Sequence, residues 1–141
     1  AHPECVTEEQ PYVPPVPTLE EVKAAKLSEI NAAADRAIGT LTATYPDREI
    51  STFDKQESEA RAYAADPTAS TPLLSALAQA RGIPLPDLVE RVLAKADAFA
   101  VASGSIIGQR QALEDRLDAC TTLEDVQGIT VNISMPGGGE A

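Results

Sequence analysis

The sequence contains few of the side chains on which most catalytic and metal sites depend. Among its 141 residues there is one histidine, His2, and there are two cysteines, Cys5 and Cys120. His2 lies in a proline-rich stretch, and neither cysteine belongs to a CxxC pair or a Cys/His cluster. These absences disfavour a His-dependent triad, a His-rich metal site and a disulfide framework. We therefore name no catalytic, cofactor-binding or metal-ligating residue, and we expect a protein that is not an enzyme and uses no cofactor.

Carboxylates are plentiful, and we expect them on solvated helix faces. Close pairs occur at Glu20 and Glu21, at Glu57 and Glu59, and at Asp115 and Asp118. Acidic residues are ordinary on exposed helical surfaces, so these spacings do not by themselves indicate general acid and base chemistry.

Positive charge and long apolar runs are also scarce. The chain has 11 Lys and Arg against 22 Asp and Glu, which gives a formal charge of −11. This charge repels phosphate backbones and anionic lipid headgroups, so we expect neither a nucleic-acid nor a membrane partner. The longest wholly apolar run, residues 98–102, is far shorter than the roughly 20 residues that span a bilayer. The first residues show no secretory signal, and we expect a soluble protein.

The sequence does have strong helical patterning. Hydrophobic residues make up 43% of it and aromatic residues 4%, so the apolar content is aliphatic and rich in alanine. We predict a mostly α protein, an irregular four-helix bundle with an extended Pro-rich N-terminal leader and a short C-terminal β-strand. The leader covers residues 1–17, the helical domain 18–127, and a strand-like tail with a Gly-rich end 128–141.

Start and stop signals divide the helical domain. Thr18 with Glu21 forms a capping box for the first helix, and the Tyr45-Pro46 pair ends it. Shorter helices are predicted over residues 51–65 and 73–81, the latter closed by Gly82, and a long fourth helix over 87–120.

Apolar stripes place the predicted core between the first and fourth helices. The seam of the first helix contains Leu27, Ile30 and Leu41, and the wide face of the fourth contains Leu88, Val92 and Phe99. We expect Phe99 to be buried at this interface. Gly104 and Gly108 fall within the fourth helix and indicate either a kink or a close approach of two helices, and the sequence leaves both open.

Residues 129–134 alternate apolar and polar side chains with a period of two, which is typical of a half-buried strand. A lone strand leaves its backbone N–H and C=O groups without partners. We therefore predict a docking strand whose edge is completed by another chain, or failing that by the leader around Val13. The predicted partner-binding residues are Ile129, Val131, Ile133, Tyr12 and Val13.

Several stretches of the sequence are similar to one known family. They are residues 18–27, 30–35, 44–47, 66–74 and 107–115. The most specific are the Tyr-Pro-Asp turn at Tyr45, the Asp-Pro to Pro-Leu-Leu loop from Asp66, and the Gly-x-Arg-x-x-Leu-Glu segment from Gly108. Over about residues 18 to 127 the chain resembles the helical C-terminal domain of tail fibre assembly proteins of tailed phages and prophages, of the pseudomonad type.

The resemblance implies a phage tail protein that binds tail fibre or baseplate proteins. It implies a role in assembly, as a chaperone or as a structural part of the virion, and a location in the host cytoplasm during assembly or in the virion tail. Homo-oligomers are compatible with this role, and no catalytic residue is implied.

The chain also departs from the family pattern. Family members often carry a β-rich domain before the Pro-rich linker, whereas 17 residues precede Thr18 here. The strand-like tail is not typical of the family either, and both departures favour a lasting structural role in the particle. The negative charge supports a second hypothesis, an acidic inhibitor that occupies a basic nucleic-acid-binding cleft.

Overall fold

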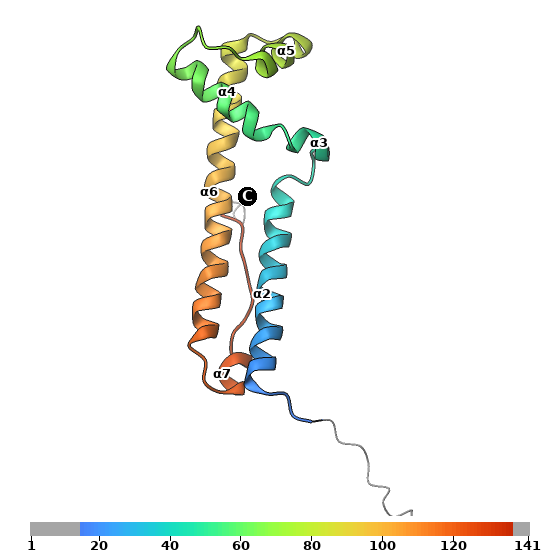
Figure 1. Ribbon diagram of the computed structural model, residues 1–141, viewed down its shortest axis with the longest axis vertical. Coiled ribbons are helices and arrows are strands. Elements are labelled where there is room, and N and C mark those ends of the chain that lie inside the picture. The colour runs from blue at the N-terminus through green and yellow to red at the C-terminus, as the bar shows by residue number, and fades with distance from the viewer. Residues whose placement is uncertain (1–14, 137–141) are drawn as a thin grey trace, which may run out of the picture.

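The computed structural model describes residues 15–136, and all regular structure within this range is helical. The helices are α2 (Leu19–Leu41), α3 (Asp47–Ile50), α4 (Phe53–Ala65), α5 (Pro72–Arg81), α6 (Leu85–Asp118) and α7 (Leu123–Gln127). Helices α2 and α6 lie side by side in opposite directions and form a stalk, with α4 and α5 at one end and α7 at the other (Figure 1). The prediction of a mostly α chain packed as an irregular helical bundle is confirmed.

Local signals set two helix ends as predicted. The Thr18 hydroxyl accepts a hydrogen bond from the Glu21 N–H at 3.1 Å, and the Thr18 N–H donates to the Glu21 carboxylate at 2.9 Å. This reciprocal capping satisfies two backbone donors at the start of α2. Gly82 closes α5 with φ at 75°, in the left-handed region where a residue without Cβ is not strained.

One apolar core joins α2, the second half of α6, α7 and the segment after α7. We call it the stalk core, and its buried members are Ile30, Leu113, Leu117, Cys120, Val126 and Ile129. Leu27 packs against it, so the N-terminal part of the predicted α2 seam does meet the long helix. Each fully buried aliphatic side chain contributes roughly 1.5–3 kcal/mol.

Another core forms where α4 and α5 pack on the first half of α6. We call it the head core, and its buried members are Ala60, Leu74, Ala78, Leu88 and Val89. The prediction that Leu88, Val92 and Phe99 pack on the first helix is therefore wrong. Leu88 and Val92 belong to the head core, and Phe99 is 42% exposed and belongs to neither core.

Helix α6 runs unbroken through both of its central glycines. It extends from Leu85 to Asp118, about 50 Å at a rise of 1.5 Å per residue, so the break that Gly104 and Gly108 allowed does not occur. Apart from the adjacent residues and the local backbone of α6 itself, a Cβ atom built at either glycine would meet no atom of the described chain within 4 Å. Packing within residues 15–136 therefore does not require a glycine at these positions.

The segment after α7 is extended but belongs to no sheet, so the predicted C-terminal β-strand is wrong. In Figure 1 it returns along the stalk between α2 and α6. The alternation itself is present: Ile129 is buried and Val131 and Ile133 are half-buried, whereas Thr130 and Asn132 are exposed. A period of two indicates which side chains turn inward but not what covers them. In this chain helices cover the inward side chains, where the prediction expected a neighbouring strand.

Candidate functional site

The middle of α6 is the most unusual surface of the described chain. No charged residue occurs from Ala98 to Gln109, although 23% of the sequence is charged. We call residues 98–109 the uncharged segment. It contains three large apolar side chains that solvent reaches: Phe99 and Ile107, each 42% exposed, and Val101, 68% exposed. Phe99 and Val101 are two residues apart and point to nearly opposite sides of α6, so Val101 and Ile107 are the pair that lies toward one side. Apolar side chains grouped on a solvent-exposed surface are a common mark of protein-binding sites.

The two glycines lie within this apolar surface. Val101, Gly104 and Gly108 are spaced three and four residues apart and therefore share one face of the helix, with Ile107 beside them. A glycine within a helix costs roughly 1 kcal/mol relative to alanine. The space over both glycines is open, so the backbone of another helix can approach α6 closely there.

The structure separates the predicted partner-binding residues. Ile129 lies in the stalk core, and Val131 and Ile133 pack against that core. The apolar face that we expected another chain to cover is thus turned toward the protein's own helices. Tyr12 and Val13 lie outside the described residues, and partner binding by these five residues stays a prediction.

Polar side chains of both stalk helices hold the extended segment, residues 129–136, which we call the strap. Lys26 of α2 donates to the Ile129 carbonyl oxygen at 3.2 Å. Gln109 of α6 bonds to Ser134 through both atoms of its amide: it accepts from the Ser134 N–H at 2.9 Å and donates to the Ser134 carbonyl at 2.8 Å. The Gln109 amide thus makes with Ser134 the pair of hydrogen bonds that the backbone of a neighbouring strand makes in a sheet.

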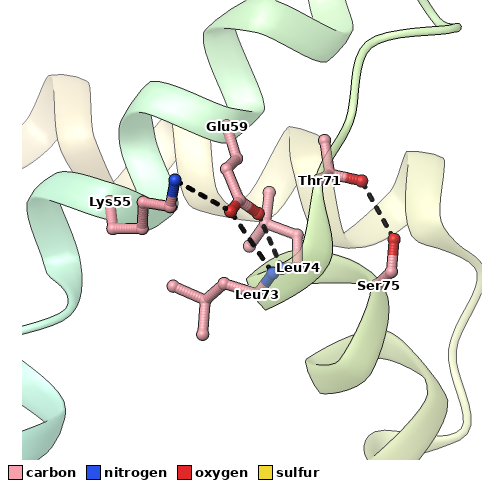
Figure 2. Close-up of polar contacts among 6 residues, drawn as sticks. All are labelled: Lys55, Glu59, Thr71, Leu73, Leu74 and Ser75. Carbon is pink, nitrogen blue, oxygen red and sulfur yellow. Dashed lines mark hydrogen bonds and ion pairs between the residues drawn. The ribbon is translucent and has the colours of Figure 1, made fainter.

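Glu59 is a buried carboxylate that the sequence did not single out. It is 4% exposed, so the prediction that Glu57 and Glu59 share a solvated face is wrong for Glu59. Figure 2 shows its carboxylate directed at the first turn of α5, where it accepts from the Leu74 N–H at 2.9 Å and from the Leu73 N–H at 3.3 Å. Lys55 lies 3.6 Å away. These contacts use both carboxylate oxygens to cap a helix, which is a structural role.

The shifted pKa values mark turns and an ion pair at the surface. The Thr68 N–H and hydroxyl lower the pKa of Asp66, and the Thr121 N–H is the largest cause that lowers the pKa of Asp125. Hydrogen bonds to Asp97 and then Glu57 raise the pKa of Arg61.

Within residues 15–136 no His, Cys, Asp and Glu side chains gather in a group of three or more that would suit a metal ion. No described helix has both the length and the hydropathy that crossing a membrane requires.

Comparison with known proteins places part of the chain in a family. Residues 94–133 match the family model described as the HI1402 helical domain. A Haemophilus influenzae protein described as uncharacterized is 56% identical over 63 residues, which are 45% of this chain and 93% of that relative. The chain belongs to the family of this Haemophilus influenzae protein. The residues that match the family model include the uncharged segment, α7 and the strap as far as Ile133, and α2 lies outside them. No solved structure matches the chain.

Proposed function

We propose that this chain is a non-enzymatic phage tail protein that binds other tail components through the uncharged segment of α6. It acts in tail fibre or baseplate assembly and is retained as a structural part of the virion. The observation that carries the proposal is the exposure of Val101 and Ile107, on either side of the open glycines, on a stretch of helix without charge. Such a surface is suited to a protein partner, because burying it removes apolar area from water without desolvating a charge.

The tail assignment rests on the resemblance to tail fibre assembly proteins. That resemblance covers residues 18–127 and therefore the whole of α2 to α7. Many side chains along the two stalk helices are exposed, and the uncharged segment lies in the middle of α6 (Figure 1). A component that stays in a tail needs surface of this kind to contact its neighbours.

A genetic complementation experiment tests the proposal. Disrupting the gene in the strain that carries it is expected to lower the yield of complete tailed particles, and the wild-type gene is expected to restore it. A gene with Val101→Asp and Ile107→Asp is expected to fail, because both changes place a charge on the contact surface. The matched control carries Ala25→Asp and Ala32→Asp at exposed positions of α2 and is expected to complement. Normal particle yield after disruption would contradict the proposal.

The net charge of −11 favours a second function, the acidic inhibitor of a nucleic-acid enzyme. Binding of that kind depends on many surface carboxylates and weakens steeply as salt rises. It would tolerate Val101→Asp and Ile107→Asp, which add negative charge and remove only apolar contact. The same variants thus separate the two functions.

A further inference from the structure

The outer side of α6 is apolar and has no side chains along its centre. Gly104 is about two and a half turns from the buried Leu113, so the two residues point to opposite sides of the helix. On the outer side the exposed Val101 and Ile107 flank the line that Gly104 and Gly108 form. A hollow of about 460 Å³ lies beside this line and is lined by Asp97, Ala98, Val101, Ala102 and Pro136.

Nothing in the described chain makes use of the missing side chains. Glycine is a poorer helix former than alanine. Apart from α6 itself and the adjacent residues, no atom of residues 15–136 lies within 4 Å of the place where a Cβ at Gly104 or Gly108 would be. Glycines on an exposed helix face let the backbone of another helix come close. The two glycines are thus suited to a contact that this chain does not make with itself.

A helix fits this surface better than an extended segment. The outer side of the uncharged segment consists of Ala100, Val101, Gly104, Ile107 and Gly108, and none of these side chains can form a hydrogen bond. The backbone groups of α6 are paired within the helix. An extended segment laid here would therefore lose water from its N–H and C=O groups without gaining a partner for them. A helix pairs its own backbone groups and avoids this loss.

Beyond the uncharged segment the same side of α6 is acidic. Asp97 lies about two turns before Gly104, and Asp115 lies about two turns after Gly108. Arg61 pairs with Asp97 at 2.8 Å, whereas no Lys or Arg of the described residues forms an ion pair with Asp115. With a net charge of −11 on the chain, a basic side chain is the complement that Asp115 lacks.

We propose that the tail component held by the uncharged segment presents an α-helix there. The backbone of this helix lies against Gly104 and Gly108, its aliphatic side chains pack beside Val101 and Ile107, and a lysine or arginine of the same helix lies near Asp115. The inference rests on the proposed function and adds the kind of element that the partner contributes.

Leucine at the two glycines tests the close approach. In the full-length chain, Gly104→Leu with Gly108→Leu places side chains in open space, so far-UV circular dichroism is expected to show intact helices. The tail fibre or baseplate protein that co-purifies is expected to fall about tenfold, because the added side chains hold the partner helix away. The matched control, Gly39→Leu, makes the same change at an open glycine of α2 and is expected to keep the wild-type amount.

Alanine at the same positions gives a graded result. Gly104→Ala with Gly108→Ala adds one methyl group at each contact and is expected to lower the retained tail protein about threefold. The same change raises the helix propensity of α6, so the isolated variant is expected to unfold at a higher temperature than the wild type. A loss of binding in a more stable protein would support a contact at the glycines and exclude a folding defect.

Reversing one charge tests the basic residue of the partner. Asp115→Lys is expected to lower the retained tail protein about tenfold at about 0.1 M NaCl, and to match the wild type at about 0.5 M NaCl, where exposed charges are screened. The matched control, Asp35→Lys, makes the same change in net charge at an exposed position of α2 and is expected to have little effect. Equal losses for the two variants would overturn the placement of a basic residue near Asp115.

The outcomes separate this inference from the proposed function. Wild-type amounts of tail protein on the leucine variant, with its helices intact, would overturn the inference and show that the partner touches side chains without a close helix. The proposed function would still stand if Val101→Asp with Ile107→Asp lost the tail protein. If the wild-type chain retains no tail protein, the proposed function fails and the inference fails with it.

Discussion

At the scale of single residues, Glu59 and Gln109 play comparable parts. Each offers two polar atoms to backbone groups of another segment that have no partner of their own. Glu59 accepts two N–H groups from the start of α5, and Gln109 pairs with both backbone groups of Ser134. The Leu74 N–H is buried and must be paired, so Glu59 fixes the start of α5, whereas the Ser134 groups are exposed and their pairing with Gln109 orients the strap without being obligatory.

Replacing Glu59 is expected to destabilise the head. In Glu59→Gln the amide cannot accept with both of its atoms, which leaves one backbone donor poorly paired beside the fully buried Leu74. We expect a loss of about 2 kcal/mol in the free energy of unfolding, measured by urea denaturation. The matched control is Glu57→Gln, whose side chain is 42% exposed and whose replacement should change stability by less than about 0.5 kcal/mol. Equal urea midpoints for wild type and Glu59→Gln would refute the capping role.

Asp125 is expected to titrate below an ordinary aspartate. The Thr121 N–H, the Thr122 hydroxyl and further hydrogen bonds favour the charged carboxylate, which lowers its pKa in the folded state. The stabilisation is therefore present above the ordinary pKa of aspartate and is lost as the pH falls through the lowered value. An NMR titration of the side chain checks this direction. A midpoint for Asp125 at or above the ordinary pKa of aspartate would contradict the capping geometry.

The sequence predicted residue roles well where the partners are near in the chain. Thr18 and Glu21 are three residues apart, so their capping box is visible as a pattern. Glu59 and Leu74 are 15 residues apart, and Gln109 and Ser134 are 25 apart. Their pairing depends on how the helices pack, and no local pattern encodes it. The sequence signal that could have indicated the burial of Glu59 was its position beside the apolar residues of a short helix.

At the scale of elements, α6 shows how one helix face changes environment along its length. Phe99, Ile106 and Leu113 are seven residues apart and nearly share a face, but Ile106 is fully buried and Phe99 is 42% exposed. The periodicity of the sequence predicts which residues share a face of α6. Whether a residue on that face is buried depends on where the neighbouring helices end, which the periodicity does not indicate. The one-turn helix α3 escaped prediction because four residues are too short for a periodic signal.

Ile106 and Phe99 are expected to differ sharply in their contribution to the stability of the folded protein. Ile106→Ala should cost about 2–5 kcal/mol, since it removes a fully buried side chain. Phe99→Ala should cost about 1 kcal/mol, since much of the ring is in contact with water in the folded protein. Thermal denaturation of both variants decides the comparison. A larger loss for Phe99→Ala would mean that another part of the chain covers this ring.

Alanine at the central glycines is expected to stabilise the isolated protein. Gly104→Ala and Gly108→Ala meet open space, so each should gain roughly 0.5–1 kcal/mol from the better helix propensity of alanine. Gly82→Ala is the contrasting control, because φ of 75° strains a residue with Cβ, and it should lose about 1 kcal/mol. Differential scanning calorimetry measures all three. A lower melting temperature for the α6 variants would reveal close packing over these glycines.

At the scale of the whole molecule, the described chain has two apolar cores that share one helix. The head core lies on the first half of α6 and the stalk core on the second, and the uncharged segment joins them (Figure 1). A mostly helical chain and a contact between its first and longest helices were predicted correctly from the sequence. The division into two cores was not predicted from the sequence, because the apolar stripes on α6 do not indicate which helix packs against each stripe. The exposed surface between the cores was missed for the same reason.

The central claim is that the uncharged segment binds a tail component, and co-purification tests it most directly. Tagged full-length chain, isolated from cells that assemble the particles and washed at about 0.5 M NaCl to screen charge contacts, is expected to retain a tail fibre or baseplate protein. Val101→Asp with Ile107→Asp should lose that protein, and the Ala25→Asp with Ala32→Asp control should keep it. If the wild-type chain retains no tail protein, or instead holds a nucleic-acid enzyme that salt releases, the claim is contradicted.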